Sequence, residues 1–237
     1  YRPTIDSYDA WGKVDDEQKN DFVSEIGSFI SNINEALSSF DSGLTLSSPD
    51  PKIMRMIEAR GNRVGLPAEV IDHFEKRLTE WCNKIDEYLK RKEKTSDDDI
   101  GPRGELEFWR SRMQKLTSIT EQLKRPDCKQ IIVHLSTLTK NATDAGKQNI
   151  ITQLRRWKQI DVEITESANE AKDNVKYLYT LERFIDPLYT GNAETITDTL
   201  PALMNSIKMI HTIARYYNTP ERMTDLFQKI TEQMIAN

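Results

Sequence analysis

The stretch that decides the fold is GPRGELEFWRSRMQKLTSITEQLK, residues 101–124. It opens with Gly101-Pro102, and proline suits the first turn of a helix because that turn does not need its missing N–H. Behind the pair, apolar residues recur every three or four positions, with Thr120 as the one polar exception. The stretch therefore predicts a helix that begins after Pro102 and buries one face. That face carries Leu106, Trp109, Met113, Leu116, Thr120 and Leu123.

The same spacing of apolar residues recurs along most of the chain, and no segment alternates as a half-buried strand would. Proline, glycine and asparagine break the pattern into separate helices. After the Gly191-Asn192 pair we expect a short turn of helix over 196–200 and a new helix that starts at Pro201. The other expected helices cover residues 18–41, 52–59, 67–92, 127–141 and 220–237.

The longest periodic tract runs from residue 147 to residue 188, with apolar residues close to a seven-residue rhythm. A helix of about 40 residues, at 1.5 Å for each residue, is a rod of roughly 60 Å. One compact neighbour cannot cover such a rod. It must pack along several shorter helices or against another chain.

These elements predict an all-α protein made of elongated helical bundles. The run KRKEKTSDDDI at residues 90–100 has bases followed by acids and reads as a solvated linker between two structural units. We therefore expect a small N-terminal helical unit over residues 1–95 and the start of a longer bundle over residues 96–237. The longer bundle contains the 40-residue helix.

Composition excludes several classes of function. The 237 residues carry 33 basic and 38 acidic side chains, a formal net charge of -5, so no overall basicity attracts nucleic acid or an anionic bilayer. No run approaches 18 consecutive apolar residues. The two cysteines, Cys82 and Cys128, indicate free structural thiols in a reduced compartment. Because the chain starts without Met and stops within helix-like sequence, we expect it to be a piece of a longer protein.

No motif for catalysis, cofactor binding or metal binding is found. The glycines at 61 and 65 lack the Lys-Ser/Thr ending and the preceding strand of a phosphate-binding loop. The three histidines are widely separated single residues. Paired carboxylates such as Glu105 with Glu107 are expected on solvated helix faces. The sequence therefore predicts no enzyme site and no cofactor in this segment.

The candidate interaction residues are tryptophans and the arginines beside one of them. The tryptophans fall on apolar stripes. They could pack in the core or anchor a partner protein, and the sequence leaves both roles open. The arginines flank Trp157 and are expected on an exposed strip, facing acidic residues of a neighbouring helix; no second aromatic platform supports nucleic-acid binding. The candidates are Trp81, Trp109, Arg155, Arg156 and Trp157.

Two stretches resemble the tail of dynein heavy chains, above all the axonemal ones. They are GPRGELEFWRSR at residues 101–112 and NTPERMTDLFQKITEQMI at residues 218–235, and the resemblance extends over residues 66–237. It implies a structural and assembly segment of a microtubule motor of cilia and flagella, with the ATPase elsewhere in the parent chain. A leading helical region that pairs heavy chains is also implied.

The resemblance further implies a set of partners and a location. The partners would be other heavy chains, intermediate and light chains, and axonemal docking factors, with neither nucleic acid nor membrane. The location would be the cytoplasm, the cytoskeleton and the ciliary axoneme. The alternative is a generic helical scaffold or tethering rod unrelated to motors. That alternative predicts repeats of about 100 residues, which we do not find in the sequence.

Overall fold

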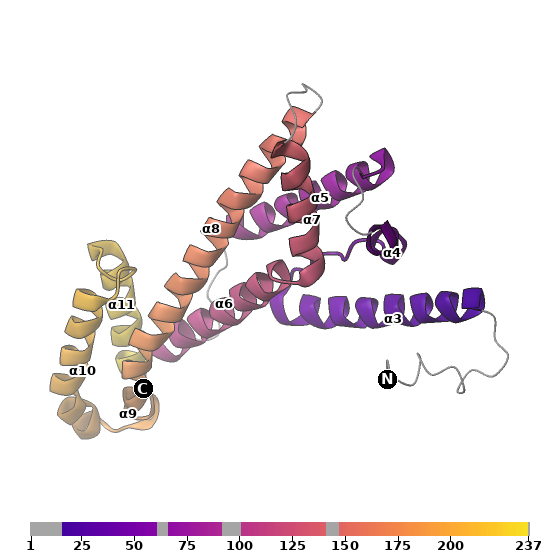
Figure 1. The fold of residues 1–237 in the computed structure, drawn as a ribbon. Helices are drawn as coiled ribbons and strands as arrows, with labels where there is room; N and C mark the ends of the chain where they lie inside the picture. The colour runs from indigo at the N-terminus through magenta and orange to yellow at the C-terminus, as the bar shows by residue number, and fades with distance from the viewer. Residues whose placement is uncertain (1–15, 61–65, 92–100, 141–146, 237) are drawn as a thin grey trace. The chain divides into compact units, whose positions relative to one another are not determined.

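The structure is a computed structural model that describes residues 16–60, 66–91, 101–140 and 147–236 (Figure 1). Within these ranges all regular secondary structure is helical, which confirms the all-α prediction. The glycine pair at 61 and 65, and residues 92–100 of the linker with the boundary expected at residue 95, lie outside the described residues.

Helix boundaries follow local sequence rules closely. The helices α4, α6, α7 and α11 each begin on a proline, whose fixed φ and missing N–H suit a first helical position. In chain order the elements are α3 (Asp16–Ser42), α4 (Pro51–Arg60), α5 (Ala68–Lys90), α6 (Pro102–Leu123), α7 (Pro126–Lys140), α8 (Gln148–Leu178), the 3-10 helix η2 (Tyr179–Phe184), α9 (Ile185–Thr190), α10 (Ala193–Ile213) and α11 (Pro220–Ala236).

The expected 40-residue helical tract is present from residue 148 to residue 190. Its first part is the α-helix α8, and it continues without a break through η2 and α9. The seven-residue rhythm predicted the tract because most of its repeating residues are buried. The rhythm did not predict the change to 3-10 geometry at Tyr179.

The expectation of a helix starting at Pro201 is wrong. The helix α10 begins at Ala193 and passes through Pro201. Asn192 caps its start, because the side-chain oxygen accepts a hydrogen bond from the backbone N–H of Thr195 at 2.8 Å. Pro201 itself is exposed. The cap upstream and the buried residues Leu203 and Ile207 downstream hold the helix together across the proline.

The chain divides into two compact units, each discontinuous in sequence. The first combines residues 1–88 with 121–160, and the second combines residues 89–120 with 161–237. The first unit therefore includes a segment that the sequence analysis assigned to its second region. The division into 1–95 and 96–237 stays a prediction.

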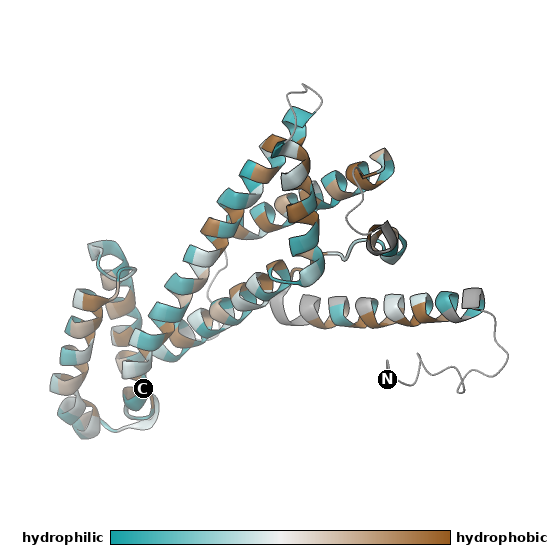
Figure 2. Ribbon diagram, in the orientation of Figure 1, coloured by the Kyte–Doolittle hydropathy of each residue, from teal (hydrophilic) through white to brown (hydrophobic). Residues whose placement is uncertain are grey.

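The first unit is built around α5. This helix is amphipathic, and its buried face packs with α7 and the first part of α8; the ring of Phe74 stacks on that of His134 at 6.2 Å. Figure 2 shows the hydrophobic and hydrophilic residues separated around the helices. The buried residues include Val70, Phe74, Leu78, Trp81, Ile85, Ile131, Leu135 and Ile150.

An extended segment before α4 belongs to the same core. Leu46 is fully buried, although it lies outside any helix. Its N–H donates to the side chain of Gln122 at 2.8 Å, and the Gln122 amide donates to the carbonyl of Leu44 at 3.0 Å. Arg125 donates to the Leu46 carbonyl at 3.0 Å. Side chains thus satisfy backbone groups that a non-helical segment would otherwise bury unpaired.

The second unit packs the start of α6 against the C-terminal helices. The predicted stripe of α6 is buried at Leu106, Trp109 and Leu116, while Thr120 is only half-buried and Ile119 is fully buried. The side chains that α10 and α11 bury include Leu203, Ile207, Ile210, Leu226 and Ile230.

Candidate functional site

A buried carboxylate is the centre of a polar cluster in the second unit. Glu105 is 6% exposed. Its Oε1 accepts hydrogen bonds from the Tyr217 hydroxyl at 2.5 Å and from Trp109 Nε1 at 3.2 Å. Its Oε2 pairs with Lys229 Nζ at 2.6 Å. The carboxylate therefore joins the start of α6 to Tyr217, which precedes α11, and to α11 itself.

The sequence brings these groups together by helical spacing. Glu105 lies one turn before Trp109, so both side chains point to the same face of α6. The Trp109 indole N–H also donates to the Tyr217 hydroxyl at 2.7 Å, and its ring meets Tyr216 edge-on at 4.6 Å. Asp225, one turn before Lys229 on α11, is a second anion for the lysine at 3.1 Å.

Burial and the carboxylate both raise the pKa of the Tyr217 phenol. Burial alone lowers the pKa of Lys229, but hydrogen bonds and charge attraction from Glu105 and Asp225 outweigh it, so the pKa of Lys229 is raised. The lysine is thus held charged and the phenol neutral. This arrangement makes a structural cross-brace between helices and contains no paired nucleophile and base.

The cluster corrects one sequence prediction. Glu105 was expected on a solvated face, but the residue is buried. Its Oε1 accepts hydrogen bonds from the side chains of Tyr217 and Trp109. Glu107 does lie on the solvated face, where it pairs with Arg110 at 2.8 Å. The available signal was the position of Glu105 four residues before Trp109, on the apolar stripe. Tyr217 and Lys229 carried no local signal.

The sequence-predicted site residues fall in two places. Trp81 and Trp157 meet in the first unit with ring centroids 5.8 Å apart, and Trp81 Nε1 donates to the Ser47 carbonyl at 3.0 Å. Trp109 belongs to the second unit. All three tryptophans are buried, which favours the core reading over the interface reading. Their role in binding a partner stays a prediction.

The two arginines beside Trp157 lie in different surroundings. Arg156 donates to the Asp86 carboxylate, through Nε at 3.0 Å, and to the Asn83 amide oxygen at 2.8 Å. Asp86 lies on α5, so Arg156 faces an acidic residue of a neighbouring helix, as expected. Arg155 is exposed.

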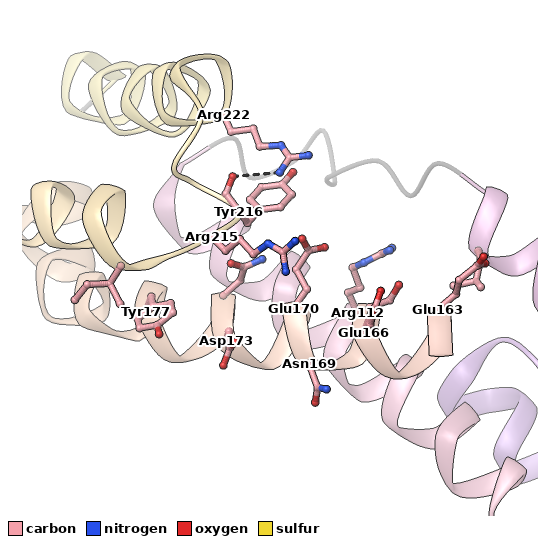
Figure 3. Close-up of a pocket in the computed structure, with 14 residues that line it drawn as sticks. Arg112, Glu163, Glu166, Asn169, Glu170, Asp173, Tyr177, Arg215, Tyr216 and Arg222 are labelled. Atoms are coloured by element: carbon pink, nitrogen blue, oxygen red, sulfur yellow. Dashed lines mark hydrogen bonds between the residues drawn. The ribbon is translucent and has the colours of Figure 1, made fainter. Parts of the chain in front are cut away.

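A groove of about 740 Å³ lies in the second unit, along the second half of α8 (Figure 3). One wall is acidic, with residues from Glu163 to Asp173. Arginines also line the groove: Arg112 from α6, Arg215 from the segment between α10 and α11, and Arg222 from the start of α11. No sequence motif pointed to this groove, because its walls come from segments far apart in the chain.

An exposed apolar stripe runs along α3. Phe29, Ile30, Ile33 and Leu37 are between 43% and 65% exposed. The stripe has the spacing of a core-facing helix face, yet its side chains stay exposed in the part of the chain that the structure describes.

Reactive and metal-binding groups do not gather in the described ranges. Burial raises the pKa of both thiols, Cys82 and Cys128, to about 11, and both cysteines are free. Among the described residues no three His, Cys, Asp or Glu side chains come together as a metal site requires. In the same part of the chain, we find no helix with the length and apolar character needed to cross a bilayer.

Comparison with known proteins identifies the family. The family described as dynein heavy chain, N-terminal region 1, matches residues 71–237. The chain is 38% identical to the flagellar outer-arm dynein gamma chain of Chlamydomonas reinhardtii, over 99% of its own length and 5% of that protein. It is 35% identical to dynein axonemal heavy chain 5 of Rattus norvegicus, over 96% of its length and 6% of the relative.

A third relative is the dynein-1-alpha heavy chain of the flagellar inner arm I1 complex of Chlamydomonas reinhardtii, which is 32% identical over 92% of this chain and 4% of the relative. The chain thus spans about one twentieth of the length of the curated relatives it matches. The resemblance carried by residues 101–112 and 218–235 is confirmed, and the chain belongs to the dynein heavy chain family, within the N-terminal tail region of its axonemal members.

Proposed function

We propose that this chain is a structural and assembly segment in the tail of an axonemal dynein heavy chain, a microtubule-based motor of cilia and flagella. It takes part in heavy-chain association, in binding intermediate and light chains, and in anchoring the motor to axonemal docking factors. Its location is the cytoplasm and cytoskeleton, at the ciliary axoneme. The names of the axonemal and flagellar relatives support the location, and the packed helices support a mechanical role.

The observation that carries the association role is the exposed stripe of α3. The helices of the packed cores bury their apolar faces, but this one leaves five large apolar side chains exposed, the four of the stripe and Phe22. Burying a Phe, Ile or Leu side chain contributes about 1.5–3 kcal/mol, so a partner helix that covers the stripe gains several kcal/mol. Two such helices side by side form a seam of the coiled-coil kind. Heavy-chain pairing through α3 uses this surface directly.

The test is sedimentation of the purified chain, alone and mixed with the corresponding region of a second heavy chain. Replacing Phe29 and Ile30 by Ser is expected to shift the association midpoint to at least tenfold higher concentration, because two anchors are removed from the seam. The control replaces Val133 and Val162, two exposed valines on α7 and α8, by Ser. The control variant is expected to associate as the unchanged chain does.

Two results would count against this role. One is a chain that stays monomeric at high concentration and binds no second heavy chain. The other is an association that Phe29→Ser/Ile30→Ser and the valine control weaken equally. Far-ultraviolet circular dichroism of each variant separates lost association from lost folding.

We further propose that the segment itself is not an enzyme and binds no cofactor, with ATP hydrolysis assigned to other parts of the parent heavy chain. Appreciable ATP turnover by a clean preparation of the chain would contradict this. The alternative of a scaffold unrelated to motors is disfavoured by the family match over residues 71–237.

A further inference from the structure

The groove of the second unit has an acidic wall with a regular spacing. Glu163, Glu166, Glu170 and Asp173 line it from α8, at steps of three, four and three residues. This is the spacing of the positions that face a partner helix in a coiled coil. Ten residues at 1.5 Å each give the wall a length of about 15 Å, or nearly three helical turns. All four carboxylates are on exposed residues.

A second and independent feature is a buried donor in the same groove. Asn174 lines the groove and is 1% exposed. Its Nδ2 has no hydrogen-bond partner within the described part of the chain. An unpaired buried amide is costly, and native proteins rarely keep one without a reason such as an absent ligand. The lining of the groove therefore holds a donor for which the described part of the chain supplies no acceptor.

Three arginines also line the groove: Arg112 from α6, which lies beside Glu166 (Figure 3), Arg215 and Arg222. Arg222 already donates to the Tyr216 carbonyl at 3.2 Å and lies over the Tyr216 ring at 4.0 Å from its centre. The guanidinium of Arg215 points into the groove toward Glu170 (Figure 3). The apolar residues Leu89 and Ile213 also line the groove. They can contact the aliphatic stems of long charged side chains.

We propose that this groove docks one helix of a partner polypeptide, with Lys or Arg on the strip that faces the exposed carboxylates of α8 and Asp or Glu on the strip that faces Arg215 and the buried amide of Asn174, which lies on α8 one turn after Glu170. The cations pair with the acidic wall, and the acids accept hydrogen bonds from the arginine and the buried amide. A purely basic helix would meet Arg215 unfavourably. A purely acidic helix would meet the wall of α8 unfavourably, so mixed charge in two strips fits both walls.

The test uses two synthetic peptides of 18 residues with blocked ends and identical composition. The first has Lys at the a and d positions of a heptad and Glu on one adjacent strip. The second has the same residues in an order without strips. Fluorescence anisotropy with the whole chain is measured at 50 and 300 mM NaCl. The first peptide is expected to bind at least tenfold more tightly than the second, and the added salt is expected to weaken it severalfold.

Charge-reversal variants locate the binding. Glu166→Lys with Glu170→Lys is expected to weaken the first peptide at least tenfold. The matched control, Asp161→Lys with Asp198→Lys, changes the net charge equally at exposed residues that do not line the groove, and is expected to change binding less than twofold. Equal binding of the two peptides, or equal loss in both variants, overturns the proposal.

The variant Asn174→Leu shows whether the buried amide serves peptide binding or the stability of the fold. Leucine has a similar size and needs no hydrogen bond, so the melting temperature is expected to stay the same or rise while the first peptide binds severalfold more weakly. A lowered melting temperature would mean that the free chain already satisfies the amide, and unchanged peptide binding would mean that the amide does not serve the site. Either result overturns the role given to Asn174 and, with it, the proposal.

Discussion

Replacing Glu105 by Gln tests the buried cross-brace between α6 and α11. The change keeps the size of the side chain but removes the charge that pairs with Lys229 at 2.6 Å. Removing one partner of a buried ion pair lowers the free energy of unfolding by about 3–5 kcal/mol, because the remaining charge stays buried without compensation. The Lys229 side chain is 16% exposed and keeps Asp225 at 3.1 Å, which places the cost at the low end of this range.

We therefore expect the free energy of unfolding to fall by about 3 kcal/mol, which corresponds to roughly 6–12 °C in melting temperature for a chain of this size. The assay is urea unfolding followed by circular dichroism. The control is Glu107→Gln, on the same helix, whose carboxylate is exposed and pairs with Arg110; its loss should cost less than about 0.5 kcal/mol.

A double-mutant cycle shows whether the pair itself is responsible. Lys229→Met removes the cation, and the combined variant leaves neither charge unpaired, so we expect a coupling free energy of about 2–3 kcal/mol. The reasoning is refuted if Glu105→Gln costs no more than Glu107→Gln, or if the effects of Glu105→Gln and Lys229→Met simply add.

Three further predictions concern other parts of the chain. Pro201→Ala restores a helical hydrogen bond in α10 and is expected to stabilise the chain by about 1–2 kcal/mol, measured by urea unfolding; a destabilised variant would contradict the assignment of Pro201 to a helix interior. At pH 8 a thiol reagent such as Ellman's is expected to react with neither Cys82 nor Cys128 in the folded chain and with both in urea, because burial raises the pKa of each thiol to about 11; fast labelling without denaturant would argue against this. The pKa values of Tyr217 and Lys229 are both raised in the fold, so their contribution to stability is complete below about pH 10 and is lost as the pH rises further. Unfolding free energies measured from pH 8 to pH 11 should therefore fall above pH 10, and less steeply in Tyr217→Phe.

The sequence was sufficient for features that depend on near neighbours in the chain. Pro102 and Pro220 marked helix starts because proline acts on its own turn. The α5 stripe from Val70 to Ile85 was readable because a period of three and four directly describes one helix face.

Structural features that depend on residues far apart in the chain could not be predicted from the sequence. The burial of Glu105 requires Tyr217 and Lys229, which lie 112 and 124 residues further along the chain. The groove requires α8 to meet the segment that carries Arg215. At Pro201 a local rule gave the wrong answer, since the cap at Asn192 starts the helix earlier than the proline does.

The 3-10 stretch Tyr179–Phe184 has a consequence for mutation of the long tract. A residue turns by about 120° in a 3-10 helix and by about 100° in an α-helix, so six residues accumulate a phase difference of roughly 120°. Ile185 and Leu188 lie seven and ten residues after Leu178, so a continuous α-helix would place them on the same stripe as Leu178; the 3-10 stretch turns them by about a third of a turn from that stripe, and both are buried there. Any change that relaxes residues 179–184 into α-helix would rotate these two side chains by about a third of a turn relative to α8 without altering a single apolar side chain. Insertions and deletions in this stretch are therefore constrained by angle as well as by length.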